Sequence, residues 1–337
     1  MELLDKTTFK KILKSKKRIV IISHVNPDGD AVGSTMAMYF FLKKYGDFDI
    51  KAITPSPYAD FLKWMPGVEN VIDFRTNSEE AKCSLENAEI IFCVDFNSEK
   101  RTGRLAGHLE CAQGLKVLID HHQEQEAFAK YGIADPTASS TAELVYDFIK
   151  NVGGNSYIDE DIAMSTYVGL MTDTGSFNYP NTKPSSHRLA AELLEYGVEP
   201  GLVSSNIYGT FSESRIKLLG YCLSEKLVVI PELSTSYISL TLEELKRFDY
   251  KDGDTEGIVN YGLSVEGIKF TAFFMEREDI IKLSFRSKGN FNVNAFAGKH
   301  FNGGGHKNAA GGQIRSSMDE AISIFTKTLD LYRDQLE

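Results

Sequence analysis

The sequence predicts an α/β protein: an N-terminal domain with a doubly wound, mainly parallel sheet and flanking helices, and a smaller C-terminal α/β domain with a mixed sheet. Three observations predict this. The chain has 337 residues, more than one core usually holds. Short apolar runs alternate with helical patterns in the first half. From about residue 226, β-like segments alternate with turns rich in glycine and asparagine.

The parallel sheet is predicted from five apolar segments that are too short to be helices. Helical patterns lie between and after them, at Ala31–Tyr45, Ser139–Asn151 and Glu160–Met171. Such alternation is typical of parallel strands joined by crossover helices. The five predicted strands are Arg18–Ser23, Phe48–Ile53, Val71–Phe74, Glu89–Asp95 and Lys116–Asp120.

We expect three parts along the chain: an N-terminal domain over residues 1–183, a helical connector over 184–225 and a C-terminal domain over 226–337. The connector is expected because a polar helical stretch is interrupted there by several glycines. The C-terminal domain ends in a predicted amphipathic helix from about Met318 to Leu336. Its predicted strands are Leu227–Ile230, Tyr237–Thr241, Lys269–Met275 and Ile280–Arg286.

Composition excludes several classes of protein. With 42% hydrophobic and 25% charged residues, the chain is not largely disordered. Its net charge of −10 disfavours binding to long duplex nucleic acid. The four cysteines form no CxxC pair, as expected of reduced thiols in the cytoplasm. No apolar run approaches the roughly 20 residues that cross a bilayer. We therefore expect a soluble cytoplasmic protein without membrane partners.

Candidate functional residues begin directly after the first predicted strand. His24, Asp28 and Asp30 lie in a Pro-Gly loop before the first long helix. Ligands bind at the carboxyl ends of strands in open α/β sheets. Within this loop, Gly29 can adopt a positive φ that other residues resist. A single aspartate here would most simply cap the helix, but one imidazole and two carboxylates in seven residues indicate a site.

Two further predicted strands end in residues of the same kind. Asp95 is the first acid after one of them, and Asp120, His121 and His122 follow the other. Three strands should therefore bring metal-ligand residue types to one edge of the sheet. Asp173 follows an apolar helix and enters a Thr/Gly/Ser turn, where alone it would be read as a turn residue.

The combined set favours two divalent cations. It contains two imidazoles and four carboxylates without a thiolate, which suits Mn²⁺ or Mg²⁺, with Co²⁺, Fe²⁺ or Zn²⁺ as alternatives. Carboxylates that are crowded together repel one another unless cations neutralise them. Two metal ions about 3.5–4 Å apart are a common solution. The six residues are His24, Asp28, Asp30, Asp95, His121 and Asp173.

The C-terminal domain contains a candidate anion site. No acid occurs between Ile280 and Met318, although the chain as a whole is acidic. A glycine cluster in this window can let backbone N–H groups approach an anion, and Arg286 offers a bidentate fork for phosphate. A flexible loop would show the same glycines, but their basic surroundings favour the anion site. The residues expected to bind substrate are Arg286, Gly303, Gly304, Gly305 and His306.

Aromatic residues near these glycines allow two interpretations. Phe291, Phe296 and Phe301 lie among asparagines in the same window. One of them could stack on a nucleobase, a contact of about 1–3 kcal/mol. For each phenylalanine individually, a place in the core of a small sheet is the better interpretation.

Taken in order, these motifs resemble a known family. HVNPDGDA, the apolar strand ending at Asp95, the Asp-His-His triplet and TDTGSF resemble the DHH phosphoesterase superfamily. FNGGGHKNAAGG, residues 301–312, is similar to the signature of the DHH-associated C-terminal domain. The resemblance covers essentially the whole chain. It is greatest to NrnA-type nanoRNases and pAp phosphatases, where pAp is 3′-phosphoadenosine 5′-phosphate.

The resemblance implies a role for each site residue. One metal would be held by His24, Asp28 and Asp95. The other would be held by Asp30, Asp95, His121 and Asp173, with Asp95 bridging the two. Asp120 would orient a histidine through a hydrogen bond, and His122 would contact the scissile phosphate. A hydroxide bridging the metals would attack phosphorus.

The resemblance also implies the substrates: short oligoribonucleotides, pAp, or both. The alternative is a phosphodiesterase for cyclic or linear dinucleotides such as c-di-AMP or pApA. A RecJ-type exonuclease is disfavoured by the acidic chain without a further nucleic-acid-binding domain, and an inorganic pyrophosphatase by the glycine-rich tail. A non-catalytic nucleotide-binding module is disfavoured by the complete ligand set. A homodimer is implied by the resemblance alone.

Overall fold

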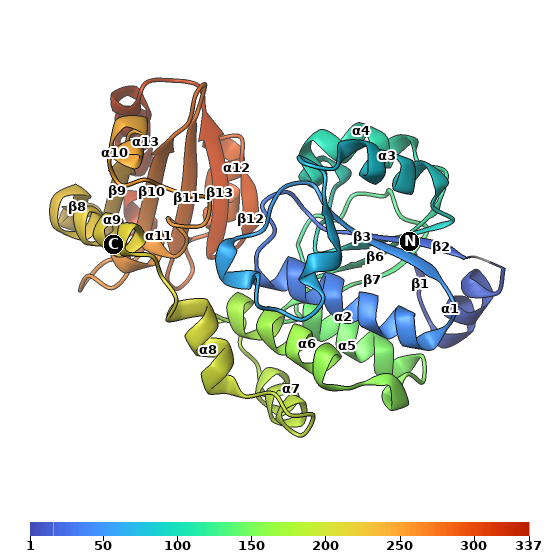
Figure 1. Cartoon of the computed structure of the whole chain (residues 1–337). Coiled ribbons are helices and arrows are strands. Elements are labelled where there is room, and N and C mark those ends of the chain that lie inside the picture. Colours follow the sequence, from blue (N-terminus) through green and yellow to red (C-terminus); the bar gives the residue numbers. More distant parts are fainter. Residues whose placement is uncertain (16, 337) are drawn as a thin grey trace. The chain divides into compact units, whose positions relative to one another are not determined.

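The computed structural model describes residues 1–15 and 17–336, and the chain forms two compact units, Met1–Thr210 and Phe211–Glu337 (Figure 1). The predicted connector contributes to both units, since α7 (Pro184–Leu194) and α8 (Pro200–Tyr208) lie in the first and α9 (Glu213–Tyr221) in the second. The finer domain boundaries expected above remain a prediction.

The first unit contains a seven-stranded sheet in which every pair of neighbouring strands is parallel. The order across the sheet is β1-β7-β6-β5-β2-β3-β4. This confirms the predicted fold class. The strands are β1 (Glu2–Leu3), β2 (Arg18–Ile22), β3 (Asp49–Thr54), β4 (Val71–Asp73), β5 (Ile90–Val94), β6 (Leu115–Asp120) and β7 (Tyr131–Ala134).

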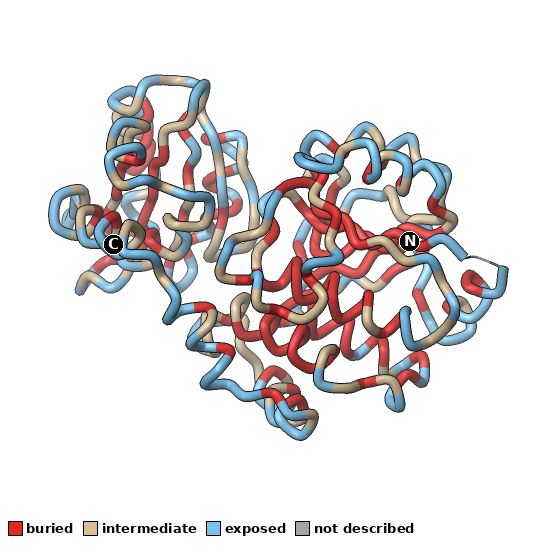
Figure 2. Tube along the Cα trace, viewed as in Figure 1, coloured by how far each residue is buried: buried red, intermediate tan, exposed pale blue. Residues whose placement is uncertain are grey.

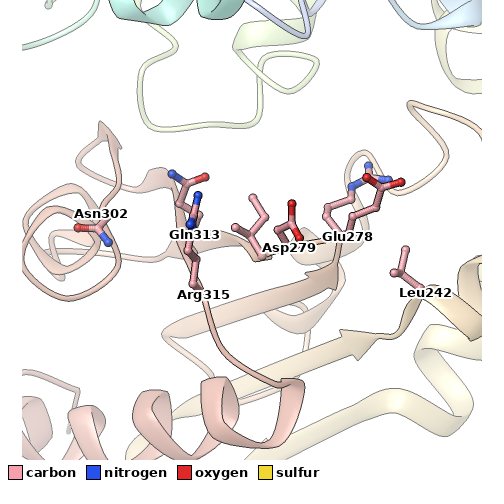
Figure 3. A pocket seen from close by; sticks show the side chains of 8 residues that line it. Leu242, Glu278, Asp279, Asn302, Gln313 and Arg315 are labelled. Carbon is pink, nitrogen blue, oxygen red and sulfur yellow. The ribbon is translucent and has the colours of Figure 1, made fainter.

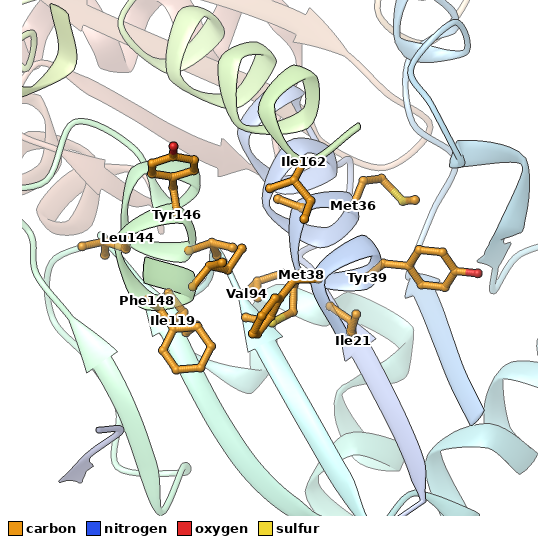
Figure 4. Close-up of a cluster of buried hydrophobic side chains, with 14 of the residues drawn as sticks. Ile21, Met36, Met38, Tyr39, Val94, Ile119, Leu144, Tyr146, Phe148 and Ile162 are labelled. Carbon is orange, nitrogen blue, oxygen red and sulfur yellow. The ribbon is translucent and has the colours of Figure 1, made fainter. Parts of the chain in front are cut away.

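Helices cover both faces of this sheet because its strands are apolar on both sides. In β2, Ile19 and Ile21 face one hydrophobic core, while Val20 and Ile22 face another. The first core contains α1 (Lys6–Leu13), α2 (Gly29–Tyr45), α5 (Thr141–Asn151) and α6 (Glu160–Asp173), and Figure 4 shows its side chains above the strands. The second core contains α3 (Ser78–Asn87) and α4 (Ala106–Cys111). Figure 2 shows the buried strands and helices in red.

The strand order reverses next to β2. From β2 the chain continues to β3 and β4 on one side, and then returns to β5, β6 and β7 on the other. In open α/β sheets, ligands bind outside the carboxyl ends of the strands at such a switch point. The fold therefore predicts a ligand site at the carboxyl ends of β2 and β5.

Glycines let α2 and α6 pack closely. A Cβ at Gly33 would lie 2.4 Å from the carbonyl oxygen of Ser165, and one at Gly29 would lie 2.4 Å from Thr172 Oγ1. Gly29 does not have a positive φ, so the expectation that it serves a turn is wrong. It is needed instead because the two helices meet there. Their close packing brings the end of α6 toward the start of α2.

We predict that Gly33→Ala destabilises the protein by about 1–3 kcal/mol, because the added methyl group overpacks a contact with backbone atoms. The measurement is urea-induced unfolding. Gly107→Ala in α4 is the matched control, because its Cβ would meet nothing within 4 Å and alanine favours helices by about 1 kcal/mol over glycine. Equal stability of the two variants would contradict the prediction.

The second unit contains a six-stranded mixed sheet in the order β12-β13-β11-β10-β9-β8, with β9 and β10 parallel and the other pairs antiparallel. Its strands are β8 (Leu227–Ile230), β9 (Thr235–Leu240), β10 (Phe270–Glu276), β11 (Ile281–Ser287), β12 (Gly304–His306) and β13 (Ala309–Ile314). Its other helices are α10 (Leu242–Arg247), α11 (Ile258–Gly262), α12 (Val293–His300), α13 (Met318–Leu329) and α14 (Arg333–Leu336).

Different helices cover the two faces of this sheet. One face packs on α12 and α13 through a core rich in phenylalanine. Phe291, Phe296 and Phe301 are buried in that core, which confirms the structural interpretation of these residues. On the opposite face, α9, α10 and α11 pack against β9 and β10. Among the described residues of the whole chain, no helix is long and apolar enough to cross a membrane.

Candidate metal centre

Polar residues follow three neighbouring strands at the switch point. His24 lies two residues after β2, Asp95 directly follows β5, and Asp120 is the last residue of β6, before His121 and His122. These residues are buried although they are polar or charged. Buried charges require partners, so the distances among their side chains decide what the site can do.

Asp95 lies at the centre of this group. Its Oδ2 is 3.4 Å from His24 Nε2, and its Oδ1 is 3.8 Å from His121 Nε2 and 3.7 Å from His122 Nδ1. The backbone of Asp95 is left-handed, with φ +65°, which is uncommon outside glycine. Such backbone strain concentrates at functional sites, where surrounding structure maintains it.

Asp95 belongs to three groups of possible ligand atoms, one of them with Asp120 and His122, and the other two contain residues selected from the sequence as metal ligands. His24, Asp28 and Asp95 form one group, and Asp30, Asp95 and His121 form the other; within each, the atoms lie within 4.8 Å of one another. Asp173 Oδ2 lies 3.6 Å from His121 Nε2, which adds a carboxylate to the second group. The structure thus brings together all six residues selected from the sequence. Their imidazole and carboxylate donors suit a pair of divalent cations.

Asp120 and His122 form a pair beside these groups. His122 Nδ1 is 2.7 Å from Asp120 Oδ1, and Asp120 is fully buried. Gln125 donates a hydrogen bond to the other Asp120 oxygen. A carboxylate held in this way fixes the orientation of an imidazole. The hydrogen bond expected between Asp120 and a histidine is therefore present, and its partner is His122.

Asp28 caps a helix and also lies in a candidate metal-binding group, so the two interpretations of this residue are compatible. Its Oδ1 accepts hydrogen bonds from the backbone N–H of Asp30 (3.1 Å) and Ala31 (3.0 Å), so it caps α2. Its carboxylate also belongs to the group with His24 and Asp95. The cap fixes the position of the side chain, and the other oxygen can serve as a metal ligand.

The N-terminus of α5 supports the site, which the sequence analysis missed. Asp30 accepts hydrogen bonds from the backbone N–H of Thr141 (2.7 Å) and Ala142 (2.9 Å). The hydroxyl of Thr141 donates to Asp95 Oδ1 at 2.8 Å. Thr141 therefore contacts one ligand of the second group and the carboxylate that both groups share. A signal was present, because Ser140 and Glu143 have the spacing of a capping box.

The crowded carboxylates change one another's pKa values. Burial, together with the charges of Asp95 and Asp173, raises the pKa of Asp30 well above its ordinary value. Burial also raises the pKa of Asp173 to about 6, against the opposing effect of His121. Burial opposes ionisation of Asp95 too, but the hydrogen bond with His24 and the nearby histidines hold its pKa below the ordinary value. Such a set of crowded carboxylates favours the binding of cations.

For His24 and His121, burial lowers the pKa and the neighbouring carboxylates raise it. Burial alone would lower the pKa of His24, but the hydrogen bond to Asp95 and the nearby carboxylates raise it. Burial also opposes a charge on His121, yet Asp173, Asp30 and Asp95 raise its pKa to about 9. In the metal-free protein at pH 7, a proton on His121 therefore compensates part of the carboxylate charge.

We predict that metal binding releases protons at pH 7 and strengthens as the pH rises toward about 9, the pKa of His121. A metal ligates deprotonated imidazole, so the proton on His121 must leave. Calorimetric titration with Mn²⁺ in two buffers of different ionisation enthalpy measures this release. Proton uptake, or an affinity that falls between pH 6 and 8, would contradict the prediction.

The second unit holds the expected substrate-binding residues. Arg286 and His306 both pair with Ala309 of β13, so they lie in one row on the same face of the sheet. The backbone N–H of Gly303 donates to Ala297, and that of Gly305 donates to Asn294 Oδ1 at 2.8 Å. Both N–H groups therefore donate hydrogen bonds to acceptors within the second unit. Gly303 and Gly305 also permit close packing, since a Cβ would lie 1.9 Å from Gly311 O at the first and 2.5 Å from Ala309 O at the second.

Comparisons with known proteins agree with this architecture. Residues 18–170 match the model of the DHH family, N-terminal domain, and residues 234–331 match the DHHA1 domain. The bifunctional oligoribonuclease and PAP phosphatase NrnA of Thermus thermophilus is 30% identical over 94% of this chain and 90% of its own. The protein of the same name in Bacillus subtilis is 29% identical over 91% and 92%.

A solved structure is also similar throughout. The crystal structure of an exopolyphosphatase-related protein from Bacteroides fragilis has a TM-score of 0.92 and 40% sequence identity, and the match covers 98% of this chain and 97% of that one. The candidate metal-ligand residues lie at the switch point of a parallel sheet, and both domain models match in the expected order. The chain therefore belongs to the DHH family, with a DHH domain followed by a DHHA1 domain.

Proposed function

We propose that this protein is a divalent-metal-dependent phosphoesterase that hydrolyses short oligoribonucleotides and removes the 3′-phosphate from pAp. The observation that carries the proposal is the pair of donor groups sharing Asp95. Membership of the DHH family supports it, as do the names of the NrnA relatives. The cyclic and linear dinucleotides named above remain the alternative substrates.

We assign one metal position to His24, Asp28 and Asp95, and the other to Asp30, Asp95, His121 and Asp173. Manganese is the proposed ion, because the donor set is rich in oxygen with some nitrogen. Divalent ions in these positions would supply Lewis acidity at phosphoryl oxygens and a nucleophile at neutral pH. The protein's part is to hold the ligands in place, with Thr141 bonded to Asp95.

His122 is the proposed contact to the scissile phosphate. Its Nδ1 is bonded to Asp120, so Nε2 is the nitrogen through which the ring would donate to a phosphoryl oxygen. The buried Asp120 carboxylate would stabilise the protonated ring during this donation. His122 would thereby offset charge on the phosphoryl group or help protonate the leaving oxygen.

We propose that Arg286 and His306 bind a phosphate of the substrate other than the scissile one. Arg286→Ala should then raise KM for pAp about 10- to 100-fold, since a hydrogen bond to a charged group contributes about 1.5–3 kcal/mol. His306→Ala should act in the same direction. Neither should lower kcat comparably on p-nitrophenyl phosphate, which has no second phosphate. Equal damage to both substrates would argue against this assignment.

The test of the proposed function is a turnover panel with Mn²⁺: pAp, a 5′-phosphorylated dinucleotide, a five-nucleotide RNA, c-di-AMP and pyrophosphate. Strong turnover of pAp and the short RNA, with little on c-di-AMP, is expected. A preference for c-di-AMP or pApA would favour the signalling phosphodiesterase. Absence of turnover on all five would count against catalysis. We further propose a cytoplasmic location and a homodimer. Light scattering of the purified protein measures its molar mass and so tests the homodimer.

A further inference from the structure

One face of the C-terminal sheet presents a row of polar side chains along β11. In β11, Arg286, Ser284 and Lys282 alternate with the buried residues Phe285 and Leu283. Every second residue of a strand points to the same face, so these three side chains share the face that bears His306. On this face α9, α10 and α11 pack against β9 and β10. Lys282 is exposed on β11.

The row has a regular spacing that matches a nucleic-acid backbone. Two residues of a strand advance about 6.8 Å, so Lys282 lies about 14 Å along β11 from Arg286. From one phosphorus atom to the next, an extended nucleic-acid backbone has as many covalent bonds as two residues of a protein strand. Cations two such repeats apart on a strand can therefore contact every second phosphate of an extended single strand.

The surface between the two cations leaves room for a ligand. Gly311 is the partner of Ser284 in β13. A Cβ at Gly311 would meet only Leu283 O, at the ordinary contact distance of 3.6 Å. Packing within the unit therefore does not require glycine there. The absence of a side chain leaves a low surface between Arg286 and Lys282.

A pocket of about 770 Å³ lies beside the loop that joins β10 to β11 (Figure 3). Gln313, the β13 partner of Lys282, lines it together with Arg315. Glu278 and Asp279 line it as well. Carboxylates accept hydrogen bonds from exocyclic amino groups of bases, and a guanidinium group binds phosphate. This mixture suits a nucleoside with its phosphate better than a bare anion.

We propose that Lys282 is a specificity-determining residue that binds a phosphate of short RNA beyond the one held by Arg286, with the following nucleotide in the Gln313–Arg315 pocket. This inference rests on the proposed function. If one phosphate of pAp is cleaved and Arg286 holds the other, none remains for Lys282. An RNA of several nucleotides does reach it. Lys282 thus favours short RNA over pAp.

The experiment compares Lys282→Gln with Lys299→Gln, which removes the same charge from α12 on the opposite face of the sheet. Binding of a fluorescent 5′-phosphorylated pentaribonucleotide is measured without added metal, over a range of salt concentrations. Lys282→Gln should weaken binding roughly three- to tenfold, as for one exposed charge-assisted contact. It should also reduce the salt slope by about 0.7, the value for one phosphate of a single strand. Lys282→Arg should restore both.

Turnover separates this inference from the proposed function. Lys282→Gln should lower kcat/KM for the pentaribonucleotide through KM, and by a larger factor than for pAp. If wild type hydrolyses the RNA and Lys282→Gln matches Lys299→Gln in binding and turnover, the role of Lys282 is refuted while the proposed function stands. If wild type binds the RNA without hydrolysing it, the proposed function fails, and the binding comparison still decides the role of Lys282. Absence of RNA binding by wild type would overturn both.

Discussion

Asp95→Asn is expected to lower turnover with Mn²⁺ by about 10³-fold or more, because Asp95 belongs to both donor groups and metal ions contribute several kcal/mol of charge stabilisation at tenfold per 1.36 kcal/mol. Asparagine is the informative replacement. It keeps the size of the side chain, and it tolerates the left-handed backbone found at this position. It removes the charge that attracts cations.

The measurement for Asp95→Asn is kcat on pAp, together with the metal content of the purified protein. Asp49→Asn is the control, because that aspartate is exposed at the start of β3, far along the strand from the carboxyl edge. Circular dichroism verifies that both variants fold. Retention of near-normal activity and metal content in Asp95→Asn would refute the shared-ligand assignment.

Thr141→Val should weaken Mn²⁺ binding by about 10- to 100-fold, the usual effect of removing a hydrogen bond that orients a metal ligand. The Thr141 hydroxyl donates to Asp95 Oδ1 at 2.8 Å within a buried site. Valine keeps the shape but cannot donate. The backbone N–H that bonds Asp30 remains in the variant, so the change isolates the contact to Asp95.

Two further variants separate positioning by Thr141 from general packing. Thr141→Ser keeps the hydroxyl and should restore metal affinity. Thr166→Val is the matched control, because Thr166 is likewise buried in a helix but donates to a carbonyl of its own helix. Calorimetric Mn²⁺ affinity is the readout, with unfolding by urea as the check on stability. Equal affinity in Thr141→Val and Thr166→Val would contradict the positioning role.

The parallel sheet could be predicted because its central strands are buried on both faces and read as continuous apolar runs. Segments β2, β3, β5 and β6 were each predicted within one residue at either end. β7 (Tyr131–Ala134) was missed because it is short and contains a glycine, so its apolar signal is weak. In the second unit, β13 (Ala309–Ile314) was missed because its alanines and glycines give no strand signal, and pairing with β11 holds it instead.

The convergence of the candidate metal-ligand residues could be predicted because strand ends in a parallel sheet meet at one edge. Thr141 could not be found in that way, because its role depends on where α5 begins relative to Asp30 and Asp95, residues distant in sequence. The purpose of Gly29 was also mistaken. Its contact with Thr172 arises from helix packing, which a local turn pattern does not encode.

The central claim is a two-metal centre built on Asp95, and native mass spectrometry of the protein titrated with Mn²⁺ tests it most directly. We predict two Mn²⁺ ions per chain for wild type, with both lost or greatly weakened in Asp95→Asn. A single ion per chain in wild type, or two ions retained in Asp95→Asn, would contradict the account.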